Sequence, residues 1–133
     1  MNEMTELIAM IAGPYLFITG CGFLISQHFY MKMIEEADKS DPILINLSGA
    51  THFIVGLLIL VKHFTWSSAT EIIVTLIGCA ATLKGALLIV APALALKTDK
   101  PSLYKLYLSS TVFIGLGAIL TYQAYGPLFG LTL

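Results

Sequence analysis

The sequence predicts an all-α fold, a single integral membrane domain over residues 1–133 built as an up-down bundle of four transmembrane helices. Apolar residues make up 57% of the chain and charged residues only 11%, whereas soluble domains carry about 25% charged residues. Four apolar stretches also reach the roughly 20 residues that cross a bilayer. Because backbone in lipid must pair its polar groups internally, and because these stretches do not alternate in hydropathy, the spans are helices rather than barrel strands.

The first predicted span covers residues 7–30. It follows the start MNEMTELIAM, which holds two acids and neither Lys nor Arg. A secretory signal peptide has a positively charged start and a small-residue cleavage site, so we interpret this span as a helix that is not removed. Pro14 lies inside the apolar stretch. It either kinks the helix or marks its start after a short interfacial segment.

Capping residues and prolines bound the other three spans. Asp41 before Pro42 combines an N-cap acid with a proline at the first helical position. Ser68 and Glu71 have the spacing of a capping box. Pro92 offers an earlier end to the third span. The predicted bounds are 42–64, 69–96 and 103–125.

Small residues mark the surfaces where these helices are expected to pack. The loops are short, so neighbouring helices should be antiparallel. In the third span, Thr75, Gly78, Thr82 and Gly85 follow a three-four spacing and therefore share one face. Glycines allow close approach between membrane helices. The glycines expected at helix contacts are Gly49, Gly56, Gly78, Gly85, Gly115 and Gly117.

A faint internal repeat would turn the bundle into two repeated helical hairpins. Gly20 of the first span corresponds to Gly78 of the third, and Gly56 of the second corresponds to Gly117 of the fourth. The two halves would then share one orientation, with an axis along the membrane normal. Apolar sequences match easily by chance, so a repeat and a coincidence both stay open.

Lysines in the short loops predict the orientation. The loop after the first span holds Lys32 and Lys39. The loop after the third span and the residues next to it hold Lys97, Lys100 and Lys105. The opposite side holds only Lys62. Positive residues accumulate in cytoplasmic loops. We therefore expect loops 31–41 and 97–102 to be cytoplasmic, with both termini outside.

Several classes of function are disfavoured. A net charge of -1 without any Arg gives no basic surface for nucleic acid. Cys21 and Cys79 form no Cys-x-x-Cys motif and have no metal-ligand spacing. His28 and His52 lie at different expected depths, which disfavours a bis-His haem. We therefore predict no cofactor, no metal and no catalytic residue.

Lys84 is the charged group deepest in a predicted span. A Lys at a helix centre costs about 2.5–3.5 kcal/mol on insertion scales, so a partner or a wet cavity should offset it. His52 lies at a similar depth in the antiparallel second span, next to Ser48 and Thr51. These four residues form a candidate intramembrane polar site. The alternatives are that Lys84 snorkels to the headgroups and that His52 makes one hydrogen bond in the bundle.

A second candidate site, at the outer membrane interface, combines His63, Trp66 and Glu71. Trp is enriched at membrane–water interfaces, so Trp66 fits an anchor. We expect His63 to hydrogen-bond Glu71 or the loop backbone. This anchoring role is favoured over a catalytic one.

The middle of the chain resembles an uncharacterised family of small bacterial four-span integral membrane proteins. The family pattern is His-Asn-x-Trp, then Thr-x-x-Gly-Trp, then Leu-Lys-Gly. The chain has Leu83-Lys84-Gly85, but Phe64 replaces the Asn and Cys79 replaces the second Trp. The resemblance implies a multi-pass protein of the bacterial inner membrane and implies no activity. It singles out for mutation His63, Trp66, Gly78, Lys84 and Gly85.

Three functions remain. The first is a structural or accessory subunit that packs through its glycines against a membrane-protein partner or a second copy. The second is an oligomeric small-solute or ion transporter or channel that uses Lys84 and His52. The third and least favoured is an enzyme, because no span core holds a carboxylate and no nucleophile–base pair is evident. The lipid bilayer is the expected partner of all three.

Overall fold

The computed structural model describes residues 3–96 and 102–131, which are mostly helical and contain no strand. The helices are α1 (Glu3–Ile25), α2 (Gln27–Glu35), α3 (Pro42–Lys62), α4 (Ala69–Val90), α5 (Pro92–Ala95) and α6 (Leu103–Tyr125), with two 3-10 turns, η1 (Ala37–Lys39) and η2 (Gly126–Phe129). Helices α1, α3, α4 and α6 are long and apolar enough to cross a membrane. The predicted all-α fold with four long apolar helices is therefore confirmed.

Two of the predicted spans are interrupted in the structure. The first is divided at Ser26, where the apolar stretch of α1 gives way to the exposed polar start of α2. The third ends as α4 at Val90, and the short α5 follows from Pro92. Proline lacks the N–H that would continue the ladder and restricts the residue before it. Pro14, by contrast, lies inside α1, which begins at Glu3.

The predicted caps are present. The Asp41 side chain accepts a hydrogen bond from the Ile43 N–H at 2.8 Å. Ser68 Oγ accepts from the Glu71 N–H at 3.2 Å. The Glu71 carboxylate accepts from the N–H of Ser67 at 3.0 Å, one residue before the cap. These bonds satisfy N–H groups that have no partner inside the helix.

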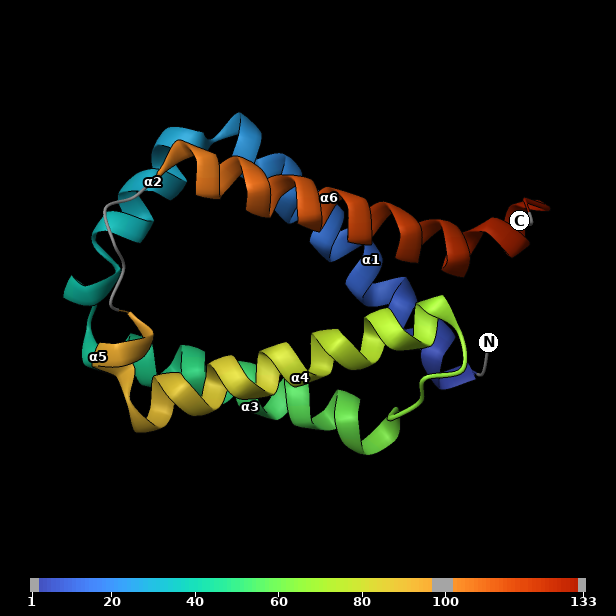
Figure 1. Ribbon diagram of the computed structural model, residues 1–133, viewed down its shortest axis with the longest axis horizontal. Helices are drawn as coiled ribbons and strands as arrows, with labels where there is room; N and C mark the ends of the chain where they lie inside the picture. The colour runs from blue at the N-terminus through green and yellow to red at the C-terminus, as the bar shows by residue number, and fades with distance from the viewer. Residues whose placement is uncertain (1–2, 97–101, 132–133) are drawn as a thin grey trace.

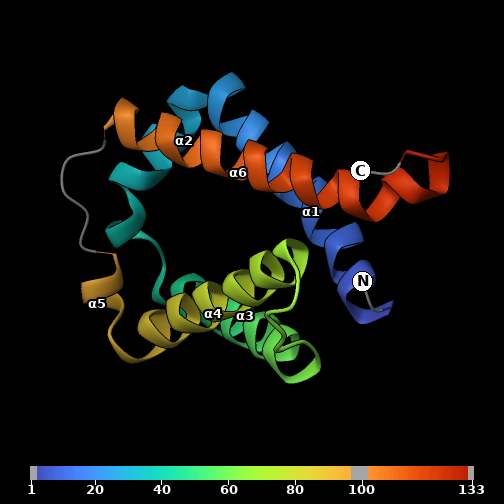
Figure 2. The ribbon, with the colours of Figure 1, turned by 45° about the vertical axis from the view of Figure 1, so that its right-hand side comes forward.

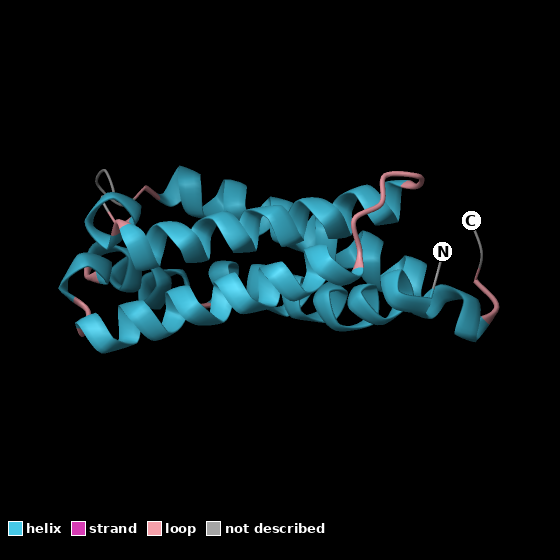
Figure 3. Cartoon of the chain, turned by 90° about the horizontal axis from the view of Figure 1, so that it is seen from below, coloured by secondary structure: helices cyan, strands magenta, loops and turns pink. Residues whose placement is uncertain are grey.

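The long helices form two closely packed pairs, α1 with α6 and α3 with α4. Figures 1 and 2 show that the pairs approach each other near the beginnings of α1 and α4 and lie apart toward α2 and α5. Figure 3 shows the long helices running along the length of the molecule. The first and last spans are therefore neighbours in space.

Glycines set the close approach in both pairs. A Cβ on Gly85 of α4 would lie 2.6 Å from the Gly49 carbonyl oxygen of α3. A Cβ on Gly117 of α6 would lie 2.8 Å from the Gly13 carbonyl oxygen of α1. Neither position has room for a side chain, so the backbones touch there.

The six packing glycines predicted from the sequence have different outcomes. Gly49, Gly56, Gly78, Gly85 and Gly117 all face a neighbouring helix, as predicted. At Gly115 a Cβ would meet nothing within 4 Å, so its role in helix packing stays a prediction. Gly117 is two positions further along α6, which turns the two glycines about 200° apart.

The repeat stays a prediction. Gly20 lies against Ile114 of α6, whereas Gly78 lies against Ile59 and Leu60 of α3. The two halves of the expected repeat are offset by 58 to 61 residues. Shifting Ile114 by 58 or 61 residues does not give Ile59 or Leu60, so the neighbours of the two glycines do not correspond.

Tyr125 compensates for Pro14 in the α1–α6 pair. Pro14 lacks an N–H, so the Met10 carbonyl has no donor four residues ahead in α1. The Tyr125 hydroxyl of α6 donates to that carbonyl at 3.0 Å. A freed carbonyl in a membrane helix needs such a partner. This bond links the Pro14 segment of α1 to the end of α6.

Candidate functional site

His63 forms a buried junction between separate parts of the chain. Its side chain is 1% exposed. Nδ1 lies 3.1 Å from Thr5 Oγ1 of α1. Nε2 lies 3.3 Å from the Glu71 carbonyl oxygen of α4. The ring therefore connects α1, the loop after α3 and the beginning of α4.

The partners of His63 fix its tautomer. A carbonyl can only accept, so the bond to Glu71 places the proton on Nε2. In the neutral ring with this tautomer, Nδ1 is the acceptor that the Thr5 hydroxyl faces. Thr65 Oγ1 lies 3.3 Å from the same Nε2 and shares its proton. The ring thus makes contacts through both nitrogens.

The candidate interface site divides into a buried part and an exposed part. Glu71 is buried near His63 and caps α4, and the Thr75 hydroxyl donates to the Thr65 carbonyl at 2.9 Å. Trp66 is 49% exposed and packs edge-on against Phe64 with ring centroids 5.6 Å apart. Of the three predicted residues, His63 and Glu71 come together, and Trp66 faces outward beside them.

A cavity of about 390 Å³ separates α1 from the α3–α4 pair. Thr51 and His52 of α3 and Tyr15 of α1 contribute its polar groups. The rest of the lining is apolar and consists of Ile8, Ile11, Ala12, Leu16, Val55, Ile59, Ile77 and Ala81. The divergence of the two helix pairs produces this space.

His52 is tied to its own helix. Its Nδ1 lies 2.7 Å from the Ser48 carbonyl oxygen, so Nδ1 carries the proton and donates. Ser48 Oγ lies 3.5 Å from the same nitrogen. The Thr51 hydroxyl donates to the Leu47 carbonyl at 2.8 Å. Nε2 of His52 has no hydrogen-bond partner among the described residues.

Lys84 is exposed and does not line the cavity. It follows Ile77 by seven residues and Ala81 by three, so it shares the cavity-facing side of α4, further toward α5. It makes no ion pair or hydrogen bond within residues 3–96 and 102–131. The structure therefore brings His52, Ser48 and Thr51 together and leaves Lys84 apart from them.

The remaining candidates take no part in these sites. His28 is exposed at the start of α2, beside Lys32 and Glu35. Cys21 and Cys79 are free, half-buried thiols. Across the described ranges, no group of three His, Cys, Asp or Glu residues is arranged to hold a metal ion.

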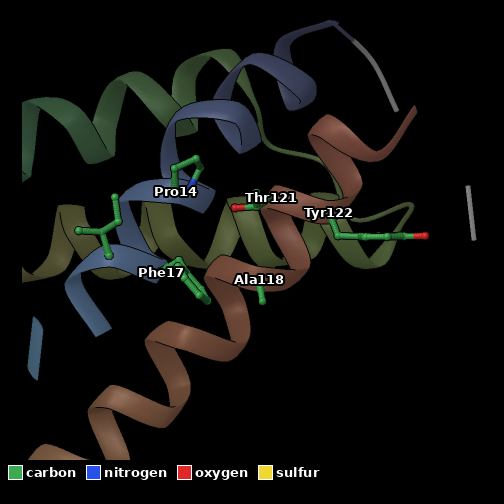
Figure 4. Close-up of a pocket in the computed structure, with 6 residues that line it drawn as sticks. Pro14, Phe17, Ala118, Thr121 and Tyr122 are labelled. Carbon is green, nitrogen blue, oxygen red and sulfur yellow. The ribbon is translucent and has the colours of Figure 1, made fainter. Parts of the chain in front are cut away.

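Sequence reasoning missed Thr5, Tyr15 and Tyr125, because each acts on a part of the chain distant in sequence. It also missed Thr121. A cavity of about 370 Å³ lies beside the α1–α6 pair, and Figure 4 shows Thr121 directed from α6 toward the Pro14 segment of α1. Thr121 Oγ1 is buried and has no hydrogen-bond partner in the part of the chain that the structure describes. It occupies the space that a side chain at Gly13 would need, 2.7 Å from a Cβ there.

Compared with models of protein families, with curated proteins and with solved structures, the chain has no match.

Proposed function

We propose that this protein is a structural or accessory membrane subunit that associates, through the outer face of α6, with another membrane protein or a second copy. The observation that carries the proposal is the open space beside Gly115. It lies in the middle of a membrane-length helix, and a Cβ there would meet nothing within 4 Å. Thr111 and Ala118 share this exposed face. Membrane helices associate through such small residues.

The buried polar groups support a structural role. His63 bonds to α1 and α4 through both ring nitrogens. Glu71 is used to cap α4. These groups hold helices together, which is what a scaffold subunit requires.

Native mass spectrometry of the protein, gently extracted from its own membrane, tests the proposal. We expect a complex with a partner or a second copy, and we expect Gly115→Leu to dissociate it. Ala80→Leu is the matched control, because Ala80 is an exposed small residue on a different helix, α4. A monomer in the unmodified protein, or equal effects of the two variants, would refute the α6 interface.

Transport is the second candidate, and the placement of His52 favours it. His52 lines a cavity between the helix pairs, and Lys84 lies on the same side of α4 nearer to α5. A fixed cation at this depth would favour anions. Lys84→Ala should abolish anion flux in liposomes, whereas Lys62→Ala, at the other end of the pair, should not. Equal flux in the two variants would exclude this role for Lys84.

We also propose that the protein belongs to the bacterial inner membrane, with loops 31–41 and 97–102 in the cytoplasm and both termini outside. The resemblance noted from the sequence supports the location. Lys32, Lys39 and Lys105 support the orientation, since they lie in α2, η1 and the beginning of α6, at one end of the helix pairs. Lys62, at the end of α3, lies at the other.

A membrane-impermeant thiol reagent applied to intact cells tests this orientation. With Cys21 and Cys79 replaced by Ala, Trp66→Cys should be labelled and Lys39→Cys should be protected until the cells are opened. The opposite labelling would show an inverted orientation.

A further inference from the structure

The cavity between α1 and the α3–α4 pair has the features of a binding site. Its volume of about 390 Å³ falls within the range of about 300–1,000 Å³ that small-molecule pockets occupy. Such pockets combine a mostly apolar wall with a few polar groups that orient the ligand. Here aliphatic side chains from α1, α3 and α4 form the wall, and His52 supplies an imidazole.

The hydrogen bond inside α3 sets what His52 can offer to a ligand. Nδ1 donates to the Ser48 carbonyl at 2.7 Å. In the neutral ring the other nitrogen, Nε2, is therefore an acceptor without a proton. Because Nε2 has no partner in the described part of the chain and its surroundings are apolar, a donor brought to it would be favoured.

Thr51 strengthens the preference of the cavity for a ligand that donates a hydrogen bond to His52. Its hydroxyl donates to the Leu47 carbonyl at 2.8 Å, so its proton is already used. No charged side chain from residues 3–96 or 102–131 lines the cavity. A ligand with a carboxylate or a phosphate would find no cation there, whereas a neutral hydroxyl would find His52.

The mouth of the cavity faces the bilayer. Ile11 and Tyr15 line it from α1, and both are 67% exposed. Since α1 is long and apolar enough to span a membrane, a molecule dissolved in the bilayer reaches the cavity sideways.

We propose that this cavity binds a neutral lipid-soluble molecule that carries a hydroxyl group, such as a long-chain alcohol, and that the hydroxyl donates to Nε2 of His52 while the apolar body fills the space between α1 and α3. This site goes beyond the accessory role proposed above and does not depend on it, because the outer face of α6 takes no part in the cavity.

Photolabelling with a matched pair of probes tests the site. One probe is a long-chain alcohol with a diazirine in its chain, and the other is its methyl ether, which has the same chain but no hydrogen to donate. Both are added to the purified full chain in nanodiscs, and mass spectrometry locates and quantifies the label. We expect the alcohol to label cavity residues of α1 and α3 with roughly fivefold higher apparent affinity than the ether, the effect of one hydrogen bond.

Variants of His52 test whether this residue causes the preference for the alcohol over the ether. His52→Phe keeps a flat ring without an acceptor and should make alcohol and ether equal. His52→Gln restores an acceptor oxygen and should recover part of the preference. His28→Phe is the matched control, because His28 is exposed on α2 and outside this cavity.

Three outcomes would overturn the proposal. Equal labelling of the wild-type cavity by both probes would show a space that takes any lipid chain. A preference that survives in His52→Phe would place the recognition elsewhere. Label confined to residues outside the cavity would show that nothing binds there. The comparison of probes on the wild-type chain needs no variant, so a variant that fails to fold does not decide the test.

Discussion

One imidazole ring, that of His63, joins parts of the chain that are far apart in sequence. Thr5 precedes it by 58 residues and Glu71 follows it by eight. The ring is 1% exposed, so losing it would remove two buried hydrogen bonds. Each such bond contributes about 0.5–1.5 kcal/mol.

His63→Phe should therefore destabilise the protein by about 1–3 kcal/mol, while the similar size of Phe preserves the packing. Thermal unfolding in detergent, followed by loss of soluble protein, measures the change. His28→Phe is the matched control and should change stability by less than about 0.5 kcal/mol, because His28 is exposed. Equal effects of the two substitutions would mean that the His63 bonds contribute nothing.

Tyr125 and Pro14 should be energetically coupled. Tyr125→Phe removes the hydroxyl that donates to the Met10 carbonyl and should cost about 1 kcal/mol. In a Pro14→Ala background the new N–H of residue 14 can bond that carbonyl within α1, so the same substitution should cost little. A double-mutant cycle on unfolding free energies measures the coupling. Additive effects would contradict this account of Tyr125.

The sequence predicted part of this residue-scale picture. His63, expected to bond Glu71 or the loop backbone, lies with its Nε2 3.3 Å from the Glu71 backbone carbonyl. Such a contact could be expected because the two residues flank one short loop. The bonds from Thr5 and Tyr125 depend on which helices are neighbours, and no local pattern reveals that.

The effect of adding a side chain at a helix glycine depends on whether that glycine faces a neighbouring helix or the bilayer. Gly85 and Gly115 are both glycines inside long helices. A Cβ on the first would press on the backbone of α3, 2.7 Å from Phe53 Cα, and a Cβ on the second would meet nothing within 4 Å.

Gly85→Ala should separate α3 from α4 and destabilise the protein by about 1–3 kcal/mol. Gly115→Ala should leave the monomer stable or stabilise it by about 0.5–1 kcal/mol, since Ala restricts the unfolded chain and favours the helix. Unfolding of the monomer in detergent compares the two. A destabilising Gly115→Ala in the isolated monomer would place a neighbour against α6 that the fold does not show.

The presence of each long helix could be predicted from the sequence. The side of each helix that packs against a neighbour could be predicted only in part. Asp41 and Ser68 were identified because capping depends on neighbouring residues alone. Gly85 was assigned to a packing face because its three-four spacing with Gly78 and Thr82 is visible in the sequence. Gly115 and Gly117 could not be told apart, since two small residues lie on opposite sides of one apolar helix.

The whole molecule consists of two helix pairs with fewer contacts between them than within them. Short loops favour pairing of consecutive helices. The consecutive helices α3 and α4 do pair, but α1 packs against α6, which lies beyond that hairpin in the sequence. The buried residues where the pairs meet include Ala9 of α1, Val74 of α4 and Leu120 of α6.

Each pair should therefore open as its own unit. Gly85→Ala should raise amide hydrogen exchange in α3 and α4 and leave α1 and α6 protected. Gly117→Ala should do the reverse, because its Cβ would lie 2.8 Å from Phe17 Cα of α1. Hydrogen exchange with mass spectrometry in nanodiscs measures both. Equal loss of protection in all four helices would show a single cooperative unit instead.

The pairing of α1 with α6 has a consequence for biogenesis. During synthesis α1 is made before α3 and α4, and its partner α6 follows all three. The α3–α4 hairpin can close as soon as it is inserted, and until α6 arrives α1 must wait in the membrane with its Met10 carbonyl lacking the Tyr125 hydroxyl. A chain released before α6 is made would therefore keep a first helix whose Met10 carbonyl lacks this donor.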